Sequence, residues 1–335
     1  MEENMIRVAL IGSGYIADCH INAFMTEEVS KTGKIVAVVG HPGSGMKAAA
    51  RIGCGFFETL EEAAAEVDFD AVDITTPTFL HEEYTVKAAN MGKHVFCEKP
   101  LALSVEAFDR MYDACRKNHV KFMAAQVLRY MSDFTKIAET IRSGQLGNIH
   151  MYSAKRLSQH PTWATWQRDP EKSGGGLYDI NVHDIDLIYS MFGMPKSVYA
   201  IGWKSPSGCW NHVATSLKWD DKQAICESSL EMPGNYPFTA EIIVTGDKGS
   251  IDFISKAGAN IKGDRTVSSR IYPVGSDGDD FKAVDNDGFA DEIRVFLEAV
   301  INDTEPPVRP EESRDVLRII VAAHKSLETG EIVSL

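Results

Sequence analysis

A mostly apolar stretch in the middle of the chain, GGGLYDINVHDIDL (residues 174–187), carries acids and an imidazole at helical spacing. On a helix that turns about 100° per residue, one narrow stripe holds the polar residues Asp179, His183, Asp186 and Ser190. An imidazole titrates near neutral pH, so His183 can exchange a proton with a hydroxyl or a carbonyl. Asp179, one turn earlier, can orient the ring and stabilise its protonated form. The stripe therefore predicts acid–base chemistry.

Two other interpretations of this stripe are open. Asp179, His183 and Asp186 could bind a metal ion, but two carboxylates and one imidazole need further ligands, and the sequence identifies none. We therefore expect no metal site. Alternatively, His183 is a core histidine that is hydrogen-bonded to Asp179. Asp186 is expected to support the site at most.

A second chemical feature is the turn GSGYIA, which follows the first apolar segment of the chain and fits the pattern G-x-G-x-x-A. Gly12 allows a tight turn, Gly14 lets the backbone approach a pyrophosphate, and Ala17 keeps the following helix close to the strand. The amino end of that helix attracts the anion. The turn predicts a dinucleotide site; the alternative is a strand-to-helix turn without a ligand.

The end of the second apolar segment bears on the choice of dinucleotide. NAD sites usually carry an acid there, which binds the ribose hydroxyls. Here the sequence continues VVGHPGSGMK, so Gly40 takes that place and is followed by His41, Ser44 and Lys47. Without a carboxylate a 2′-phosphate is not repelled, which favours NADP slightly. The alternative is a loop that holds the adenosine loosely and accepts either cofactor.

A lysine follows a further apolar segment, in the sequence HVFCEKP. If that segment is a strand of a parallel sheet, Lys99 lies at the carboxyl edge, where such sheets bind ligands. Its ammonium can donate a hydrogen bond to a developing alkoxide or orient a carbonyl. Pro100 fixes the chain after it, and a cis bond is one way to do so. The alternative is a surface ion pair of Glu98 and Lys99.

The first third of the chain alternates between apolar strands and helical segments. This pattern predicts a parallel sheet that is covered on both faces. The expected strands are Arg7–Ile11, Lys34–Gly40, Ala71–Thr75, His94–Cys97 and Lys121–Ala125. The expected helices are Tyr15–Met25, Met46–Ile52, His81–Met91 and Val105–Asn118.

The pattern changes beyond residue 125. Successive alternating strands over 197–255 predict an antiparallel sheet with one covered face. Residues 258–287 are polar and glycine-rich, and we expect a loop with a short strand at most. The expected helices of this part, besides the polar stripe, lie at 133–143, 288–302 and 311–328.

Composition limits the class of protein. The net charge is −14 over 335 residues and no lysine- or arginine-rich block occurs, which argues against nucleic acid and anionic membranes as partners. No apolar run reaches the 18 or so residues that span a bilayer. The start MEENMIRVALIG has no signal-peptide pattern, and the six cysteines lack zinc spacing, so we expect free thiols and a cytoplasmic protein.

The ordered set GSGYIA, TTPTFLH, GKHVFCEKP and GGGLYDINVHDIDL resembles the glucose–fructose oxidoreductase and inositol dehydrogenase (Gfo/Idh/MocA) family over nearly the whole chain. The resemblance implies an α/β protein with an N-terminal Rossmann domain, at 1–125. It also implies a C-terminal α/β domain, at 126–335, for substrate binding and oligomerisation. The second domain would have a large open, mainly antiparallel sheet through which the chain forms a homodimer or homotetramer. The C-terminal helix can pack back on the first domain.

The resemblance also implies NAD(P)-dependent hydride transfer on a sugar or polyol, with Lys99, Asp179 and His183 as catalytic residues. Where the family motif commonly has glycine, this chain has Asn181. The expected cofactor contacts are Gly12, Gly14, Tyr15, Ile16, Ala17, His41, Ser44, Thr76, Pro77, His81, Glu98 and Lys99. The expected substrate contacts are Lys99, Arg129, Trp163, Trp166, Arg168, Asp179 and His183. For His81, Arg129, Arg168 and the two tryptophans, a purely structural role is the alternative.

Three functions are compatible with these residues. The first is a dehydrogenase or reductase for a sugar or cyclitol, and the second is redox-assisted cleavage of a glycosidic bond with NAD. The third is a regulator that binds a dinucleotide without catalysis. Because a regulator does not need Lys99, Asp179 and His183 together, their presence favours an enzyme.

Overall fold

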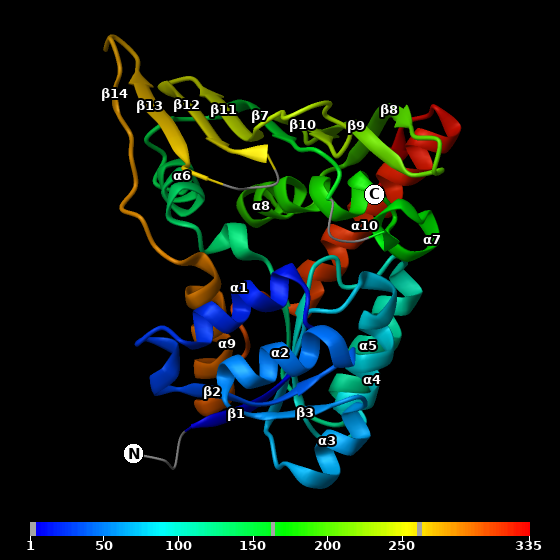
Figure 1. Cartoon of the computed structure of the whole chain (residues 1–335). Helices are drawn as coiled ribbons and strands as arrows, with labels where there is room; N and C mark the ends of the chain where they lie inside the picture. The colour runs from blue at the N-terminus through cyan, green and yellow to red at the C-terminus, as the bar shows by residue number, and fades with distance from the viewer. Residues whose placement is uncertain (1–4, 162–164, 260–262) are drawn as a thin grey trace. The chain divides into compact units, whose positions relative to one another are not determined.

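The computed structural model describes residues 5–161, 165–259 and 263–335 (Figure 1). The chain forms two compact units. The first comprises the residues up to Met131 together with Asp287–Arg314, and the second comprises Ser132–Asn286 and Asp315–Leu335. The expected boundary at 125 assumed two continuous domains, whereas the first unit takes up a later segment of the chain.

The first unit is built on a six-stranded parallel sheet with the order β3-β2-β1-β4-β5-β6. Its strands are β1 (Ile6–Ile11), β2 (Gly33–Val39), β3 (Gly55–Phe57), β4 (Ala71–Ile74), β5 (His94–Glu98) and β6 (Phe122–Ala125). This is the strand order of a Rossmann fold, and it reverses between β1 and β4. The predicted Rossmann domain is confirmed.

Six helices accompany this sheet in the described part of the first unit. They are α1 (Tyr15–Phe24), α2 (Pro42–Ile52), α3 (Leu60–Glu66), α4 (His81–Asn90), α5 (Val105–Lys117) and α9 (Gly288–Ile301). Sequence analysis missed β3 and α3, although a capping box of Thr59 and Glu62 marks the start of α3. Helix α9 was expected in the second domain, but it packs against α1 and β1, with Leu297 filling the space beside Gly33.

The second unit contains a nine-stranded sheet with the order β14-β13-β12-β11-β7-β10-β9-β8-β15. Its neighbouring strands are antiparallel except for β7 and β10, so the predicted mainly antiparallel sheet is confirmed. The strands are β7 (Ile149–Leu157), β8 (Ser197–Lys204), β9 (Trp210–Lys218), β10 (Gln223–Ser229), β11 (Phe238–Gly246), β12 (Gly249–Ala257), β13 (Thr266–Pro273), β14 (Asp279–Asp280) and β15 (Val333–Ser334). The segment expected to be mostly loop thus supplies β13, which pairs along β12.

One face of this sheet is covered and the other carries exposed apolar residues. Helix α8 (Val182–Phe192) packs against β7 and β10, and α6 (Ser132–Arg142) packs against α8. The remaining helices are α7 (Pro170–Ser173) and α10 (Pro310–Thr329), and α10 crosses the division between the two units. The exposed apolar residues of the sheet are Tyr199, Ile201, Trp203, Ile225 and Ile243.

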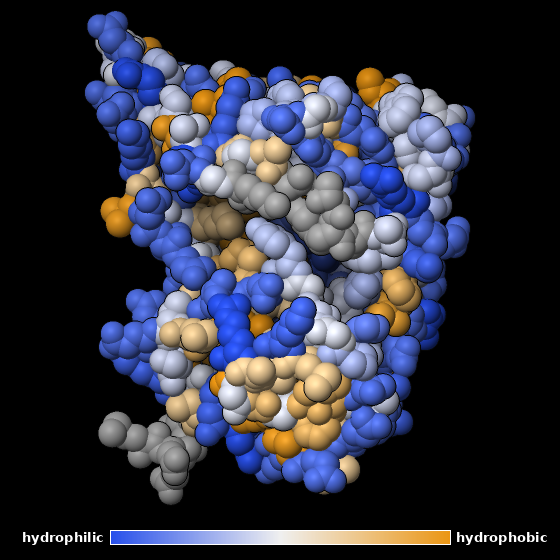
Figure 2. All heavy atoms as spheres, viewed as in Figure 1, coloured by the Kyte–Doolittle hydropathy of each residue, from blue (hydrophilic) through white to orange (hydrophobic). Residues whose placement is uncertain are grey.

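The surface agrees with the composition. Figure 2 shows a largely hydrophilic face on which apolar residues gather in smaller patches, one of them over α2. All six cysteines are free thiols. Among the described helices, none has the length and apolar character that a membrane crossing requires.

Candidate active site

The glycine turn lies between β1 and α1, where the sheet order reverses. Gly12 has φ +112°, and a Cβ there would lie 2.7 Å from Thr75 Oγ1 and 2.8 Å from the Thr75 carbonyl. Only glycine therefore lets the chain pass so close to the end of β4. Gly14 caps α1 and is exposed, and a Cβ on it would have no heavy atom within 4 Å. The space beside Gly14 at the amino end of α1 fits a pyrophosphate.

The residues after Gly14 differ in exposure in the way the motif predicts. Ala17 is buried, so α1 lies close to the sheet. Tyr15 is 40% exposed and Ile16 is half-buried. Tyr15 and Ile16 therefore flank the glycine turn on its accessible side, where the sequence predicts contacts to the dinucleotide.

The first turn of α2 is joined to the glycine turn by two hydroxyl groups. Ser44 Oγ lies 2.6 Å from Ser13 Oγ. His41 caps α2, and its Nδ1 accepts a hydrogen bond from the Gly43 N–H at 3.2 Å. Helix α2 begins at Pro42, earlier than predicted, because this cap satisfies its first turn. Ser44 therefore lies beside the glycine turn. No acid is present from residue 40 to residue 47.

The turn after β5 holds Lys99 at the carboxyl edge of the same sheet. The Lys99–Pro100 bond is cis, as the sequence allowed. His81 Nδ1 lies 2.9 Å from the Pro100 carbonyl oxygen, and His81 Nε2 lies 2.9 Å from that of Thr76. Burial lowers the pKa of His81, while the contacts to the two carbonyl groups act in the other direction. His81 therefore joins the loop after β4, with Thr76 and Pro77, to the Lys99 turn.

Two buried residues behind this turn were missed by sequence analysis. His20 of α1 places Nδ1 2.9 Å from Asp73 Oδ2 and Nε2 3.3 Å from Glu98 Oε1. The Lys99 N–H donates to Glu98 Oε2 at 2.9 Å. Although burial acts the other way, the carboxylates of Asp73 and Glu98 raise the pKa of His20 well above its usual value. Asp73 could have been noticed in the sequence, because it is an acid within the otherwise apolar strand AVDI.

Arg129, predicted as a substrate contact, forms an ion pair within the first unit. It ends a short 3₁₀ turn, Val127–Arg129, and its Nη1 lies 2.6 Å from Glu312 Oε2. The two side chains are 12% and 18% exposed. Arg129 and Arg309 lower the pKa of Glu312 against the effect of burial. Of the two roles that the sequence left open, this geometry favours the salt bridge.

In the second unit, the predicted polar stripe begins in a π-helix rather than in a regular α-helix. Leu177–Asn181 form the π-turn and α8 follows directly. The wider turn shifts Asp179 relative to His183 from the register expected at 100° per residue. Asp179 and His183 are half-buried, whereas Asp186 is buried. The stripe is therefore divided: its first two members reach the surface, and Asp186 belongs to the interior.

Close packing explains the glycines before the π-turn. A Cβ on Gly175 would lie 2.7 Å from Cys209 Cβ, and one on Gly176 would lie 2.9 Å from the Asn211 carbonyl oxygen. Within this unit, Gly175 and Gly176 therefore pack against the chain at the start of β9. Asn181, the departure from the family motif, is fully buried.

The side chain of Asn181 is hydrogen-bonded to two strands of the sheet. It donates to the Cys226 carbonyl at 3.3 Å and accepts from the Thr215 hydroxyl at 2.9 Å. A glycine at this position would leave both groups without this partner. The substitution thus fastens the π-turn to β9 and β10 and leaves Asp179 and His183 in place.

Sequence analysis also missed a buried ion pair that involves Asp184, the residue after His183 in the sequence. Arg156 of β7 donates from Nε and Nη2 to the two carboxylate oxygens of Asp184, at 3.0 and 2.8 Å. The side chains are 5% and 1% exposed. Asp184 lies on the opposite side of α8 from the predicted stripe, so periodicity alone assigned it no role. The pair fixes the helix that carries His183 to the sheet.

A further histidine lies near Asp179. Burial lowers the pKa of His160, and the charges of Glu231, Arg168 and Asp179 act on it. Neither ring nitrogen of His160 has a hydrogen-bond partner within the described residues. Arg168 is exposed and Trp166 is half-buried in the short turn Trp166–Arg168, while Trp163 lies outside the described residues. Arg168 and Asp179 are therefore close enough to His160 for their charges to act on its ring.

The fold and these motifs define a nicotinamide-binding class of oxidoreductase. The chain belongs to the oxidoreductase family with an NAD-binding Rossmann fold (GFO_IDH_MocA), whose model matches residues 6–126. The model of the family's C-terminal alpha/beta domain matches residues 138–335. The resemblance that the four motifs indicated is confirmed.

Individual relatives show which proteins the chain is similar to. A 2,7-anhydro-N-acetylneuraminate hydratase from Mediterraneibacter gnavus is 34% identical over 198 residues, which are 58% of this chain and 51% of that protein. A scyllo-inositol 2-dehydrogenase (NADP(+)) from Bacillus subtilis is 30% identical over 256 residues, 74% and 75% of the two chains. The chain spans about half the length of the first curated relatives it matches.

Solved structures share the fold. The WlbA dehydrogenase from Bordetella pertussis, solved with NADH and UDP-GlcNAcA, superposes with a TM-score of 0.82 at 22% identity. The match covers 100% of this chain and 99% of that one.

Proposed function

We propose that this protein transfers a hydride between NAD(P) and a secondary alcohol or ketone of a sugar, cyclitol or sugar derivative. The observation that carries the proposal is that two predicted site features lie at one edge of the parallel sheet. The glycine turn after β1 and Lys99 after β5 lie at the carboxyl ends of strands with only β4 between them. An exposed glycine cap at Gly14 and a lysine on that edge fit a dinucleotide with a substrate beside it.

Each protein group has a role in this proposal. When bound, the nicotinamide supplies the acceptor or donor of the hydride. The Lys99 ammonium donates a hydrogen bond to the substrate oxygen and stabilises it as an alkoxide. His183 takes the hydroxyl proton and returns it in the reverse direction, while Asp179 orients the imidazole. The joint action of Lys99 and His183 on one substrate remains a prediction.

A panel assay tests the proposed function. The full chain is mixed with NAD or NADP and a set of aldoses, sugar acids and inositols, and reduced nicotinamide is followed by its absorbance. We expect turnover with a subset of sugars or cyclitols. Dinucleotide binding without turnover across the panel would instead favour a regulator.

Redox-assisted cleavage or hydration of a sugar is a second candidate. Relatives from M. gnavus and Escherichia coli carry the name of a hydratase of an anhydro sugar acid, and the E. coli protein matches 82% of this chain at 29% identity. Such a reaction returns the nicotinamide to its starting state. It would appear in the same panel as sugar conversion, detected by chromatography, without a net change in absorbance.

We also propose that NADP is preferred, because the segment after β2 offers Ser44 and the exposed Lys47 at the start of α2 and carries no carboxylate from residue 40 to residue 47. Lys47→Glu is expected to weaken NADPH binding by about tenfold and to leave NADH binding within about twofold, since one charged contact to a phosphate is worth 1–3 kcal/mol. Nicotinamide fluorescence titrations measure both affinities. Lys34→Glu, the same charge change at the exposed amino end of β2, is the control. Equal losses for both dinucleotides would contradict the preference.

We also propose an oligomeric state and a cellular compartment. A homodimer or homotetramer is supported by the exposed apolar residues on the sheet of the second unit, Tyr199, Ile201, Trp203, Ile225 and Ile243. The cytoplasm is the proposed compartment, because its reducing conditions would keep the six free thiols reduced.

A further inference from the structure

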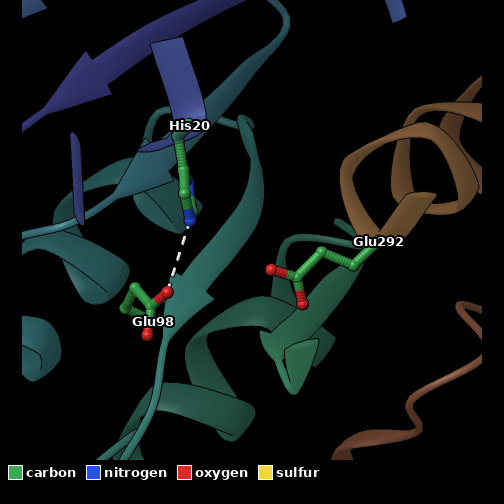
Figure 3. A group of neighbouring side chains, drawn as sticks. All are labelled: His20, Glu98 and Glu292. Atoms are coloured by element: carbon green, nitrogen blue, oxygen red, sulfur yellow. Dashed lines mark hydrogen bonds and ion pairs between the residues drawn. The ribbon is translucent and has the colours of Figure 1, made fainter. Parts of the chain in front are cut away.

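A third carboxyl group lies beside the His20–Glu98 pair of the first unit. Glu292 of α9 is fully buried, and neither of its carboxyl oxygens has a hydrogen-bond partner within the described residues. The nearest ligand atoms of His20, Glu98 and Glu292 all lie within 4.8 Å of one another. Figure 3 shows the Glu292 carboxyl group directed from α9 toward the other two side chains.

The charges of this cluster can be assigned from its contacts. His20 has a carboxylate at each ring nitrogen, Asp73 at Nδ1 and Glu98 at Nε2. A carboxylate only accepts hydrogen bonds, so both contacts are satisfied when the ring is a doubly protonated imidazolium. One positive charge then lies between two negative ones. An ionised Glu292 would add a third buried negative charge without a counter-charge, which is far more costly than keeping its proton.

The cluster also borders the backbone of the proposed catalytic lysine. Glu98 accepts the Lys99 N–H through Oε2 and faces His20 through Oε1. Negative charge on Glu292 would repel the Glu98 carboxylate, whereas a neutral acid can stay beside it. The carboxyl group that faces Glu98 comes from α9, a helix that is distant in the sequence.

We propose that Glu292 is a positioning residue for Lys99: as a neutral carboxylic acid it places a polar but uncharged group beside Glu98, which leaves Glu98 in its two contacts. The proposal rests on the proposed function for the role of Lys99 in turnover. The claim that Glu292 is neutral and supports the Lys99 backbone does not need that function.

The charged neighbours of Glu292 determine the direction of its pH dependence. They are Glu98 of β5, His20 of α1, Asp73 of β4 and Asp287 at the start of α9. Burial, with Glu98 adding to it, raises the pKa of Glu292 well above its usual value near 4.5. Above pH 4.5 the unfolded chain loses this proton while the folded chain keeps it. Folding stability is therefore progressively lost as pH rises from 4.5 toward the folded pKa.

Glu292→Gln tests the neutral state without any substrate. The amide keeps the shape and has no proton to lose, so it removes the pH-dependent cost. We expect Glu292→Gln to raise Tm relative to the natural chain, and the gain to be larger at pH 8 than at pH 5. Glu298→Gln, on the same helix but in an ion pair with Arg294, should show no such pH-dependent gain. A larger loss of Tm at pH 8 than at pH 5 would show that Glu292 is ionised and overturn the proposal.

Glu292→Leu tests positioning, since leucine fills similar space without a polar group. Hydrogen exchange of the Lys99 amide reports the contact to Glu98 directly. We expect exchange at least about tenfold faster in Glu292→Leu and within about twofold of the natural chain in Glu292→Gln. Exchange unchanged in Glu292→Leu would overturn the positioning role.

Turnover separates this proposal from the proposed function. In Glu292→Leu we expect kcat to fall about 10- to 100-fold, as a displaced catalytic group would cause, with dinucleotide affinity within about threefold. Glu292→Gln should restore kcat, and an unchanged kcat in Glu292→Leu counts against positioning. If the natural chain turns over no sugar, the proposed function fails, and the Tm and exchange measurements still decide the role of Glu292.

Elemental analysis provides an independent check. One imidazole and two carboxylates are also donors that divalent transition metals accept. We expect less than about 0.1 equivalent of zinc or manganese in the purified chain, because protons occupy the ring nitrogens of His20 and the carboxyl group of Glu292. A stoichiometric metal that is lost in Glu292→Gln would overturn the neutral-acid assignment.

Discussion

Lys99→Met is expected to lower kcat by about 10²- to 10³-fold, and His183→Ala by about 10²- to 10⁴-fold, while dinucleotide affinity stays within about threefold. Removing Lys99 takes away the donor that stabilises the alkoxide, a loss of about 3–4 kcal/mol. Removing His183 takes away the proton acceptor of the same step. Steady-state kinetics on a substrate from the panel, with fluorescence titration of NADPH, measure both quantities.

Two matched variants control for the loss of charge and of an imidazole. Lys34→Met removes an exposed lysine at the amino end of β2, and His150→Ala removes an exposed histidine from β7. Both should keep the kcat of the natural chain. Near-full activity in Lys99→Met or His183→Ala would show that the role assigned to that residue is incorrect.

Arg156→Met is expected to destabilise the protein by about 3–5 kcal/mol, because it leaves the Asp184 carboxylate buried without its bidentate partner. Denaturant unfolding followed by circular dichroism measures the loss. Because Asp184 lies on α8 next to His183, we expect activity to fall with stability in this variant.

A neighbouring lysine provides the control for this ion pair. Lys155 precedes Arg156 on β7, points to the other face of the sheet, is 41% exposed and pairs with Glu241. Lys155→Met should cost less than about 1 kcal/mol, as exposed ion pairs do. The double variant Arg156→Met/Asp184→Leu should regain most of the lost stability, since no charge is left buried. Equal losses in Arg156→Met and Lys155→Met would contradict a special role for the pair.

Local chemistry made the first half of the candidate site predictable. A glycine turn after an apolar strand can be recognised locally. Gly12 must pass close to the end of the neighbouring strand β4, and Gly14 must leave the backbone accessible to a ligand. The lysine after HVFCE follows from the same reasoning, since the carboxyl ends of parallel strands share an edge. These features need only a few consecutive residues to be recognised.

The second half was predicted less completely because it depends on backbone geometry. Periodicity at 100° per residue grouped Asp179 with Asp186, but the π-turn separates them. The π-turn is held by the contacts of Asn181 to β9 and β10, and those strands lie later in the chain. No local sequence pattern predicts such a contact.

The sequence alone determined the class of fold, the dinucleotide turn and the residue types for hydride and proton transfer. Each of these depends on short-range periodicity or on a single turn. Only the tertiary structure decided which buried charges meet. His20, Asp73, Glu98 and Glu292 come from four separate elements, and the sheet order brings them together. The physical reason is that the state of a buried acid depends on what surrounds it in space, and spacing along the chain does not reveal that.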